Sequence, residues 1–180
     1  RLSIEPWVTL HHFTTPLWLA QRGGLSQPSG VDAFARFVEL VARHYGDLVG
    51  HWCTINEPTI VAEMGYRYGY FPPRLQNEEL TVAMLRNLFA AHARACEVVR
   101  GASGDGCEVG ITLAVQAHEP LRPDSEADRR VALRRDAETN QACYDALRTG
   151  VFSYPDRVPE EIPALAGSST FVGIQYYTRF

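Results

Sequence analysis

The sequence predicts an α/β fold built on parallel strands, and two observations lead to this prediction. Short apolar segments alternate with segments of helical periodicity along the whole chain, and the longer connections follow the apolar segments. Such alternation is typical of a parallel sheet, because each helix returns the chain to the end of the sheet where the next strand begins. Two architectures fit this order, a doubly wound sheet and part of a (β/α)8 barrel.

Four segments are predicted to be strands, because each is a short run of apolar, β-branched and aromatic residues. The third is almost continuously apolar (EVGITLAVQ), which is typical of a strand that is covered on both faces. The strands are expected at residues 6–11, 50–55, 108–116 and 171–177.

Three longer segments are predicted to be helices, because apolar residues recur in them every three to four positions. They are expected at residues 31–45, 80–100 and 129–148. Ser29 and Asp32 resemble a capping box at the start of the first helix, and Gly46 provides a stop after it. In the third helix, Leu133 and Asn140 are expected to share one face.

Composition and charge argue against some classes of partner. The 180 residues suffice for a domain with its own core, and 17 basic residues stand against 21 acidic ones without a Lys/Arg block. A nucleic-acid or membrane-surface partner therefore has no electrostatic support. No apolar run approaches the length of about 20 residues that a membrane helix needs. The proline-rich stretch 154–163 is predicted to be a surface loop.

The four cysteines, Cys53, Cys96, Cys107 and Cys143, are widely spaced and none belongs to a CxxC pair. A zinc or redox motif is therefore not expected, and scattered free thiols suit a reducing compartment, which predicts a cytoplasmic protein. The glycine-rich run 101–106 follows a helix and precedes a strand, which is the wrong order for a phosphate loop, and is predicted to be a turn. We expect no metal and no organic cofactor.

Glu57 is the residue with the clearest chemical context. It follows the second predicted strand directly, and Pro58 after it cannot continue the ladder because it has no N–H. A carboxylic acid at a strand end, in a partly dry pocket, is the kind of group with which a retaining glycosidase protonates the departing oxygen. Asn56 beside it can both donate to and accept from a sugar hydroxyl. Taken alone, however, Asn-Glu-Pro is more often a turn.

Two other strand ends carry polar side chains. His12 closes the first strand and can donate to a sugar hydroxyl, with a satisfied structural histidine as the equal alternative. His11 and His12 are adjacent and should point to opposite faces, which disfavours a shared metal ion. Tyr176 and Tyr177 close the last strand. One of them is expected to face inward, where it could hydrogen-bond a carboxylate, and core packing is the alternative.

The joint order of these motifs resembles the β-glucosidase family of retaining glycosidases (glycoside hydrolase family 1), which are (β/α)8 barrels. The matching segments are 6–13 (PWVTLHHF) with Pro16 and Trp18, 45–47 (YGD), 52–58 (WCTINEP), 65–72, and 171–178 (FVGIQYYT). The resemblance covers nearly the whole chain in the right order. It implies a retaining β-glycosidase that acts on β-glucosides or related β-glycosides.

The resemblance also implies roles for four residues, position by position. Glu57 resembles the acid/base catalyst. Asn56 and His12 resemble residues that hold the sugar in the cleavage subsite. Tyr177 resembles the tyrosine that hydrogen-bonds the nucleophile.

Departures from the family limit these expectations. Its nucleophile lies in a Thr-Glu-Asn-Gly segment on a later strand, and the 180 residues contain no such segment. We therefore expect residues 1–180 to form a single partial (β/α)8-barrel domain, truncated at both ends, with four parallel strands and intervening helices. The alternative is a catalytically incompetent barrel fragment, or a half-barrel that needs a partner or has no hydrolytic activity. Thr14, Thr15 and Gln175 depart from the family pattern and leave the sugar preference open, and the oligomeric state is not predicted.

Overall fold

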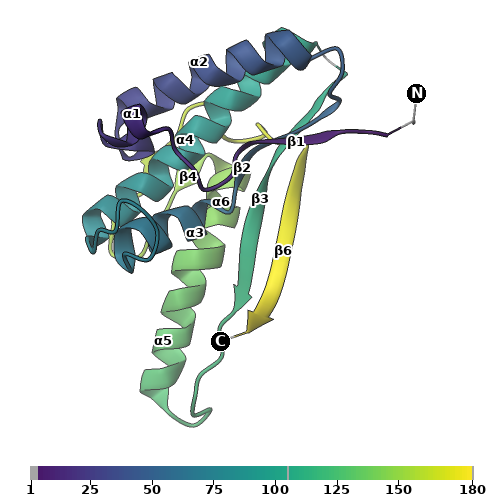
Figure 1. Cartoon of the computed structure of the whole chain (residues 1–180). Coiled ribbons are helices and arrows are strands. Elements are labelled where there is room, and N and C mark those ends of the chain that lie inside the picture. Colours follow the sequence, from purple (N-terminus) through teal and green to yellow (C-terminus); the bar gives the residue numbers. More distant parts are fainter. Residues whose placement is uncertain (1–3, 105, 180) are drawn as a thin grey trace.

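The computed structural model describes residues 4–104 and 106–179, which form a parallel four-stranded sheet with helices between the strands (Figure 1). The strand order is β1-β2-β3-β6, and all three neighbouring pairs are parallel. The strands are β1 (Trp7–His11), β2 (His51–Asn56), β3 (Glu108–Ala117) and β6 (Phe171–Arg179). The four strands expected from the sequence are therefore confirmed, with small shifts at their ends.

Two long helices, α2 (Pro28–Tyr45) and α4 (Glu78–Ser103), lie side by side and cover one face of the sheet (Figure 1). A third helical segment runs through α5 (Glu126–Asp136), the π-helix η3 (Ala137–Gln141) and α6 (Ala142–Thr149). The shorter elements are α1 (Leu17–Ala20), the 3-10 helix η1 (Gly24–Ser26), α3 (Pro58–Ala62), the π-helix η2 (Glu63–Arg67), β4 (Val151–Phe152) and β5 (Glu160–Glu161).

The hydrophobic core lies between the sheet and the two long helices. Trp52 of β2, Phe89 of α4 and Ile111 of β3 are completely buried in it. Burial of such apolar surface is the main force that holds the strands against the helices. The sheet thereby becomes a rigid support for the residues at the carboxyl ends of its strands.

The opposite face of the sheet is strongly curved. The Trp7 ring stacks on His51 at 4.2 Å and meets the Phe171 ring edge-on at 5.2 Å, although β1 and β6 are the outermost strands. Gly110 permits this approach, since a Cβ atom there would lie 2.3 Å from the Phe171 carbonyl oxygen. Such curvature is what the wall of a closed barrel requires. Among the described residues, β1 and β6 each pair on one side only.

The expected start of the first helix is wrong. The helix begins at Pro28, three residues earlier than predicted, and Gln27 precedes it without a side-chain cap hydrogen bond. Ser29 and Asp32 therefore do not form a capping box. Proline at the first helical position already has the φ angle of a helix and has no N–H that needs an acceptor, so the helix starts there.

The third helix also differs from the expectation. It begins at Glu126, where the Ser125 hydroxyl accepts a hydrogen bond from the Asp128 N–H at 3.2 Å. The π-helix η3 interrupts the regular periodicity, because a π-turn contains an extra residue and rotates the faces that follow. Leu133 is consequently 71% exposed while Asn140 is buried, so the two do not share a core face.

The stretch 154–163 is only partly a surface loop. It contains β5, which pairs antiparallel with β4, and both Tyr154 and Ile162 are buried. The Tyr154 hydroxyl accepts a hydrogen bond from the guanidinium group of Arg67, which is far away in the sequence, and this contact keeps Tyr154 in its buried position.

Candidate active site

Glu57 stands at the point where β2 ends and α3 begins. Its N–H donates to the carbonyl oxygen of Thr112 at 2.9 Å, which extends the contact between β2 and β3 by one residue. Its backbone is left-handed, with φ 50° and ψ 66°. Few residues other than glycine adopt this conformation, and it turns the chain sharply from the strand into the helix.

The Glu57 carboxyl group is buried at the end of the strand. Only 4% of the residue is exposed, and its Oε1 atom has no hydrogen-bond partner among the described residues. Burial raises the pKa of Glu57, because loss of water disfavours the charged form, while Tyr177 and His12 lower it. A carboxyl group with a raised pKa holds its proton more readily at neutral pH, as an acid catalyst must.

Tyr177 of β6 lies beside Glu57, although the two residues are far apart in the sequence. The tyrosine is 75% exposed, and the negative charge of Glu57 raises the pKa of its hydroxyl group. Its strand neighbour Tyr176 is also exposed. Of the two tyrosines considered from the sequence, the structure thus brings Tyr177 to the candidate acid.

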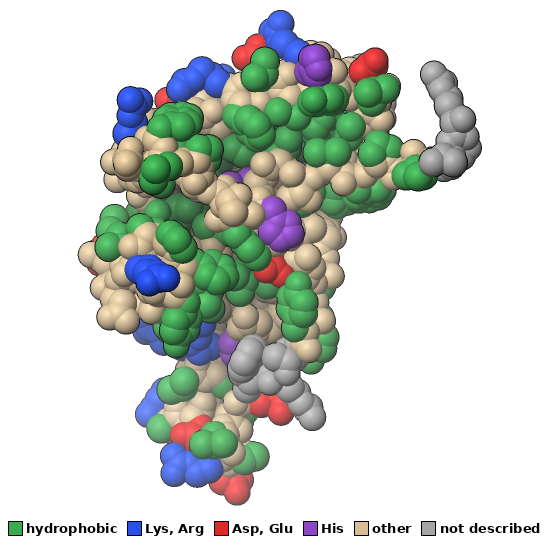
Figure 2. Space-filling model, in the orientation of Figure 1, with side chains coloured by type: hydrophobic (Ala, Val, Ile, Leu, Met, Phe, Trp, Pro, Cys, Tyr) green, Lys and Arg blue, Asp and Glu red, His purple; other side chains and the backbone are tan. Residues whose placement is uncertain are grey.

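Asn56 and His12 lie together on the same side as Glu57. The Asn56 amide nitrogen donates to the His12 Nε2 atom at 3.4 Å, and His12 also lowers the pKa of Glu57. Asn56 is buried, whereas His12 is exposed. All four candidate residues therefore come together at the carboxyl ends of β1, β2 and β6. In Figure 2, histidine and acidic side chains adjoin one another among hydrophobic ones in the middle of the face shown.

Thr112 of β3 is a site residue that the sequence did not reveal. Its hydroxyl group donates to Asn56 Oδ1 at 2.9 Å, which fixes the amide so that its nitrogen faces His12. The only available signal was a single hydroxyl residue within an almost wholly apolar strand, and that pattern does not indicate which side chain it will contact.

The turn after β1, like the turn after β2, contains a non-glycine residue with a positive φ angle. Phe13 has a positive φ of 67°, and the Thr14 N–H returns to the His12 carbonyl oxygen at 2.8 Å. The Phe13 ring lies 5.8 Å from the Phe71 ring and meets His12 edge-on at 4.8 Å. The Phe13 ring thus links His12 to Phe71.

The two adjacent histidines have different surroundings, as expected from their alternation. The His11 ring is buried against Phe34 of α2, and burial lowers its pKa to about 4. In residues 4–104 and 106–179, the His, Cys, Asp and Glu side chains form no group of three or more that could hold a metal ion.

His92 of α4 has a structural position in the core. It is completely buried, its Nδ1 atom lies 2.7 Å from the Thr54 hydroxyl, and its Nε2 atom lies 2.8 Å from the Ser169 hydroxyl. Burial lowers its pKa to about 3, so the neutral ring connects β2 to helix α4.

No helix in the described part of the chain is long and apolar enough to cross a membrane.

Comparison with known proteins identifies the family. The sequence profile of glycosyl hydrolase family 1 matches residues 1–178. The chain belongs to glycosyl hydrolase family 1. This places the buried Glu57 and its neighbours in a family of enzymes that cleave glycosidic bonds, as the motifs had indicated.

Two curated relatives illustrate the match to family 1. The chain is 34% identical to a 6-phospho-beta-galactosidase of Clostridium acetobutylicum, over 89% of this chain and 33% of that protein. It is 28% identical to beta-glucosidase A of Thermotoga maritima, over 98% of this chain and 42% of that protein. The chain therefore spans between a third and a half of the length of these relatives.

Solved structures agree with the sequence match. A beta-glycosidase from Pyrococcus horikoshii superposes with a TM-score of 0.86 at 32% identity, over 98% of this chain and 40% of that one. The beta-glucosidase from Thermotoga maritima in complex with glucoimidazole gives a TM-score of 0.87 at 26% identity, over 98% and 42%. The four-stranded sheet and its helices thus correspond to part of the family's (β/α)8 barrel.

Proposed function

We propose that this chain is the part of a retaining β-glycosidase that supplies its acid/base catalyst, Glu57. The observation that carries the proposal is the placement of Glu57: a buried carboxyl group with a raised pKa at the carboxyl end of β2. In (β/α)8 barrels the carboxyl ends of the strands carry the catalytic residues. Asn56 and His12 beside it are suited to hydrogen-bond the sugar.

The proposed reaction is a double displacement. In the first step a carboxylate nucleophile outside these 180 residues forms a bond to the anomeric carbon, while Glu57 gives its proton to the departing glycosidic oxygen. In the second step the ionised Glu57 takes a proton from water, whose oxygen displaces the carboxylate and releases the sugar. The reaction needs no metal ion or organic cofactor.

The proposed substrates are β-glucosides or related β-glycosides. Support comes from the names of the relatives, which include beta-glucosidase, beta-galactosidase and 6-phospho-beta-galactosidase. These names share the β-glycosidic bond and differ in the sugar, so the proposal is made for the bond and not for one sugar. A nucleic-acid or membrane partner is not proposed. The four cysteines are buried and none forms a disulfide bond, which supports a reducing compartment such as the cytoplasm.

For the 180-residue chain by itself we propose little or no hydrolysis. Retention requires two carboxyl groups about 5 Å apart, and the segment that carries the second one in the family is absent from the sequence. The chain would then become active only when the remaining part of the barrel is supplied.

A chimaera tests both statements. This chain replaces the matched 42% of beta-glucosidase A of Thermotoga maritima, and the chimaera and the 180-residue chain are assayed with an aryl β-glucoside. We expect hydrolysis by the folded chimaera, its loss in the Glu57→Gln variant, and no hydrolysis by the chain alone. A folded chimaera whose activity survives Glu57→Gln would contradict the role of Glu57, and rapid turnover by the chain alone would contradict its dependence on the rest of the barrel.

A further inference from the structure

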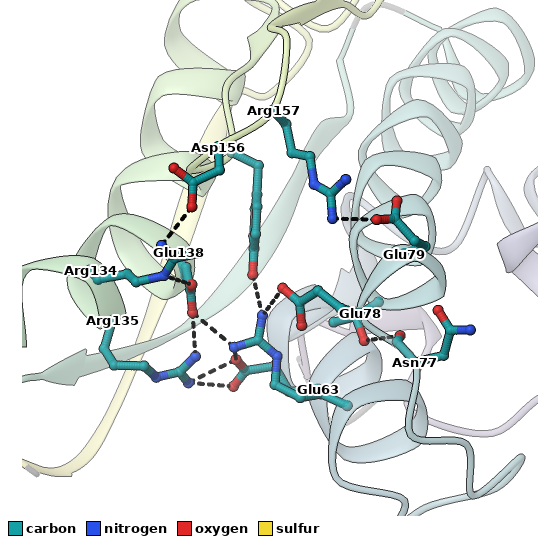
Figure 3. A network of polar contacts seen from close by, with 12 residues as sticks. Glu63, Asn77, Glu78, Glu79, Arg134, Arg135, Glu138, Asp156 and Arg157 are labelled. Carbon is teal, nitrogen blue, oxygen red and sulfur yellow. Dashed lines mark hydrogen bonds and ion pairs between the residues drawn. The ribbon is translucent and has the colours of Figure 1, made fainter. Parts of the chain in front are cut away.

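We propose that a buried ion-pair network, formed by Glu63, Arg67, Arg135 and Glu138, is the device that positions Glu57. The network lies away from Glu57 itself and connects the segment that follows it to the helical segment after β3 (Figure 3). We assign its members a positioning role and not a catalytic one.

The backbone of Glu57 needs support on both sides of the residue. Its left-handed conformation is one that a non-glycine residue keeps only when the surrounding structure holds it. Its side chain does not cap helix α3, and Pro58 after it has no N–H to donate. On the strand side, the hydrogen bond from its N–H to Thr112 provides one anchor. A second anchor has to come from the segment that follows.

The segment that follows is α3 and the π-helix η2, which continues it without a break. Helix α3 alone has only five residues, too few to be stable without tertiary contacts. The π-helix supplies these contacts, because it carries Glu63 at its start and Arg67 at its end. Interruptions of this kind occur frequently at functional sites.

Glu63 and Arg67 are fixed by several charged hydrogen bonds. Both carboxylate oxygens of Glu63 accept from Arg135 Nη2, at 2.8 and 3.0 Å. Arg67 donates to Glu138 at 2.8 Å, and its other terminal nitrogen donates to Glu78 at 2.7 Å and to the Tyr154 hydroxyl. The side chain of Glu63 is 7% exposed and that of Glu138 is 4% exposed, so these bonds lie in a region of low dielectric.

The opposite side of the network is also a π-helix. Glu138 lies in η3, and its carboxylate accepts hydrogen bonds from Arg67, Arg134 and Arg135. These guanidinium groups lower the pKa of Glu138 against the effect of burial, so the residue is ionised at neutral pH. Two irregular turns, far apart in the sequence, thus each contribute a buried glutamate to one network.

Buried ion pairs of this type contribute little net stability, because removal of both charges from water offsets their attraction. Their geometry is nevertheless demanding, since a guanidinium fork meets a carboxylate in few orientations. The network is therefore better suited to fixing the orientation of α3 and η2 than to strengthening the fold. Glu57, at the start of that segment, is the residue whose position depends on it.

The test measures the position of Glu57 and not hydrolysis, so it can fail independently of the proposed function. In Arg135→Gln, the hydrogen bonds from Arg135 to Glu63 and to Glu138 are lost, whereas Glu138 keeps those from Arg67 and Arg134. We expect Glu57 to gain access to water and its pKa, measured by NMR titration of the carboxyl carbon in the 180-residue chain, to fall. Loss of a positive charge alone would raise that pKa, so the sign separates positioning from simple electrostatics.

Arg134→Gln is the matched control, because Arg134 bonds to Glu138 and Asp156 and, within the described part of the chain, forms no hydrogen bond or ion pair with α3 or η2. It should leave the pKa of Glu57 unchanged or slightly raised. Arg135→Lys keeps the positive charge but replaces the planar guanidinium group, which is needed for the paired hydrogen bonds to the carboxylates. It should lower the pKa of Glu57 as Arg135→Gln does, and it provides the test if the Gln variant does not fold. An unchanged or raised pKa of Glu57 in the folded Arg135 variants would overturn the proposal.

Exchange of the Glu57 backbone amide gives a second measurement. Its hydrogen bond to Thr112 should open more often in Arg135→Gln, with exchange about tenfold faster than in the unmodified chain. Exchange at His92, on the other side of the sheet, serves as the internal reference for global stability. Equal acceleration at both amides would show that the network acts only on overall stability and would also overturn the proposal.

Discussion

The hydroxyl group of Tyr177 lies beside the carboxyl group of Glu57, and each alters the pKa of the other. Tyr177 lowers the pKa of Glu57, and the charge of Glu57 raises the pKa of Tyr177. The resemblance to family 1 suggested that this tyrosine orients the nucleophile. Within these residues its carboxyl neighbour is instead the proposed acid/base catalyst.

Replacement of Tyr177 by Phe should raise the pKa of Glu57. A hydroxyl that donates to a carboxylate stabilises its charged form, and removal of that donor leaves burial as the dominant effect. An NMR titration of the Glu57 carboxyl carbon measures the change. The matched control is Tyr176→Phe in the neighbouring, exposed position, which should leave the pKa as it was. A fall in the pKa of Glu57 in Tyr177→Phe would show that the hydroxyl does not stabilise the carboxylate.

The buried neutral His11 should make the stability of the fold depend on pH. Its pKa is about 4 in the folded chain against an ordinary value near 6.5. Between these values the unfolded chain binds a proton that the folded chain does not, so the free energy of unfolding falls as pH falls from about 6.5 towards 4. Near pH 5 the contribution is about 1 kcal/mol per pH unit.

Urea unfolding at several pH values tests this expectation. In His11→Leu the slope of unfolding free energy against pH near pH 5 should decrease by that amount. The control is Leu40→Gln at an exposed position of α2, which removes no titratable group and should leave the slope unchanged. An unchanged slope in His11→Leu would mean that the ring is not buried in its neutral form.

Gly110 should not tolerate a side chain. A Cβ atom there would lie 2.3 Å from the Phe171 carbonyl oxygen and 2.7 Å from its ring, so Gly110→Ala should destabilise the fold by about 1–3 kcal/mol. Gly101→Ala is the matched control, because a Cβ atom at this helical position meets nothing within 4 Å and alanine favours the helix. Equal unfolding midpoints for both variants would contradict the close approach of β3 and β6.

The sequence predicted the four strands well because each is a compact apolar run with clear boundaries. The start of α2 was missed because Pro28 decides it and the Ser29 pattern is only a local resemblance. The joint presence of His12, Glu57 and Tyr177 could be expected for a simple reason. In a parallel sheet all strand ends that precede the helices meet at one edge, so motifs at those ends must converge.

The π-helices and the network between them could not be predicted from local patterns. Glu63 and Arg67 have the spacing of an ordinary exposed helical pair, and nothing near them in the sequence indicates Glu138 or Tyr154. Their burial depends on contacts across about 70 to 90 positions of the chain, such as the bond from Arg67 to Glu138 at a separation of 71. Thr112 was missed for the same reason.

The central claim is that Glu57 protonates the leaving group, and the dependence of Glu57→Gln on leaving-group acidity tests it most directly. The folded chimaera with beta-glucosidase A is assayed as kcat/KM, which reports on the step that breaks the glycosidic bond. With a poor leaving group that needs protonation, the variant should lose activity by roughly 10²–10⁴-fold, whereas with a highly acidic phenol it should lose little. Glu108→Gln is the control, because Glu108 lies at the amino end of β3 and the candidate site lies at the carboxyl ends of the strands. It should leave kcat/KM for both substrates unchanged. Equal losses on both substrates in Glu57→Gln would contradict the assignment of Glu57 as the acid/base catalyst.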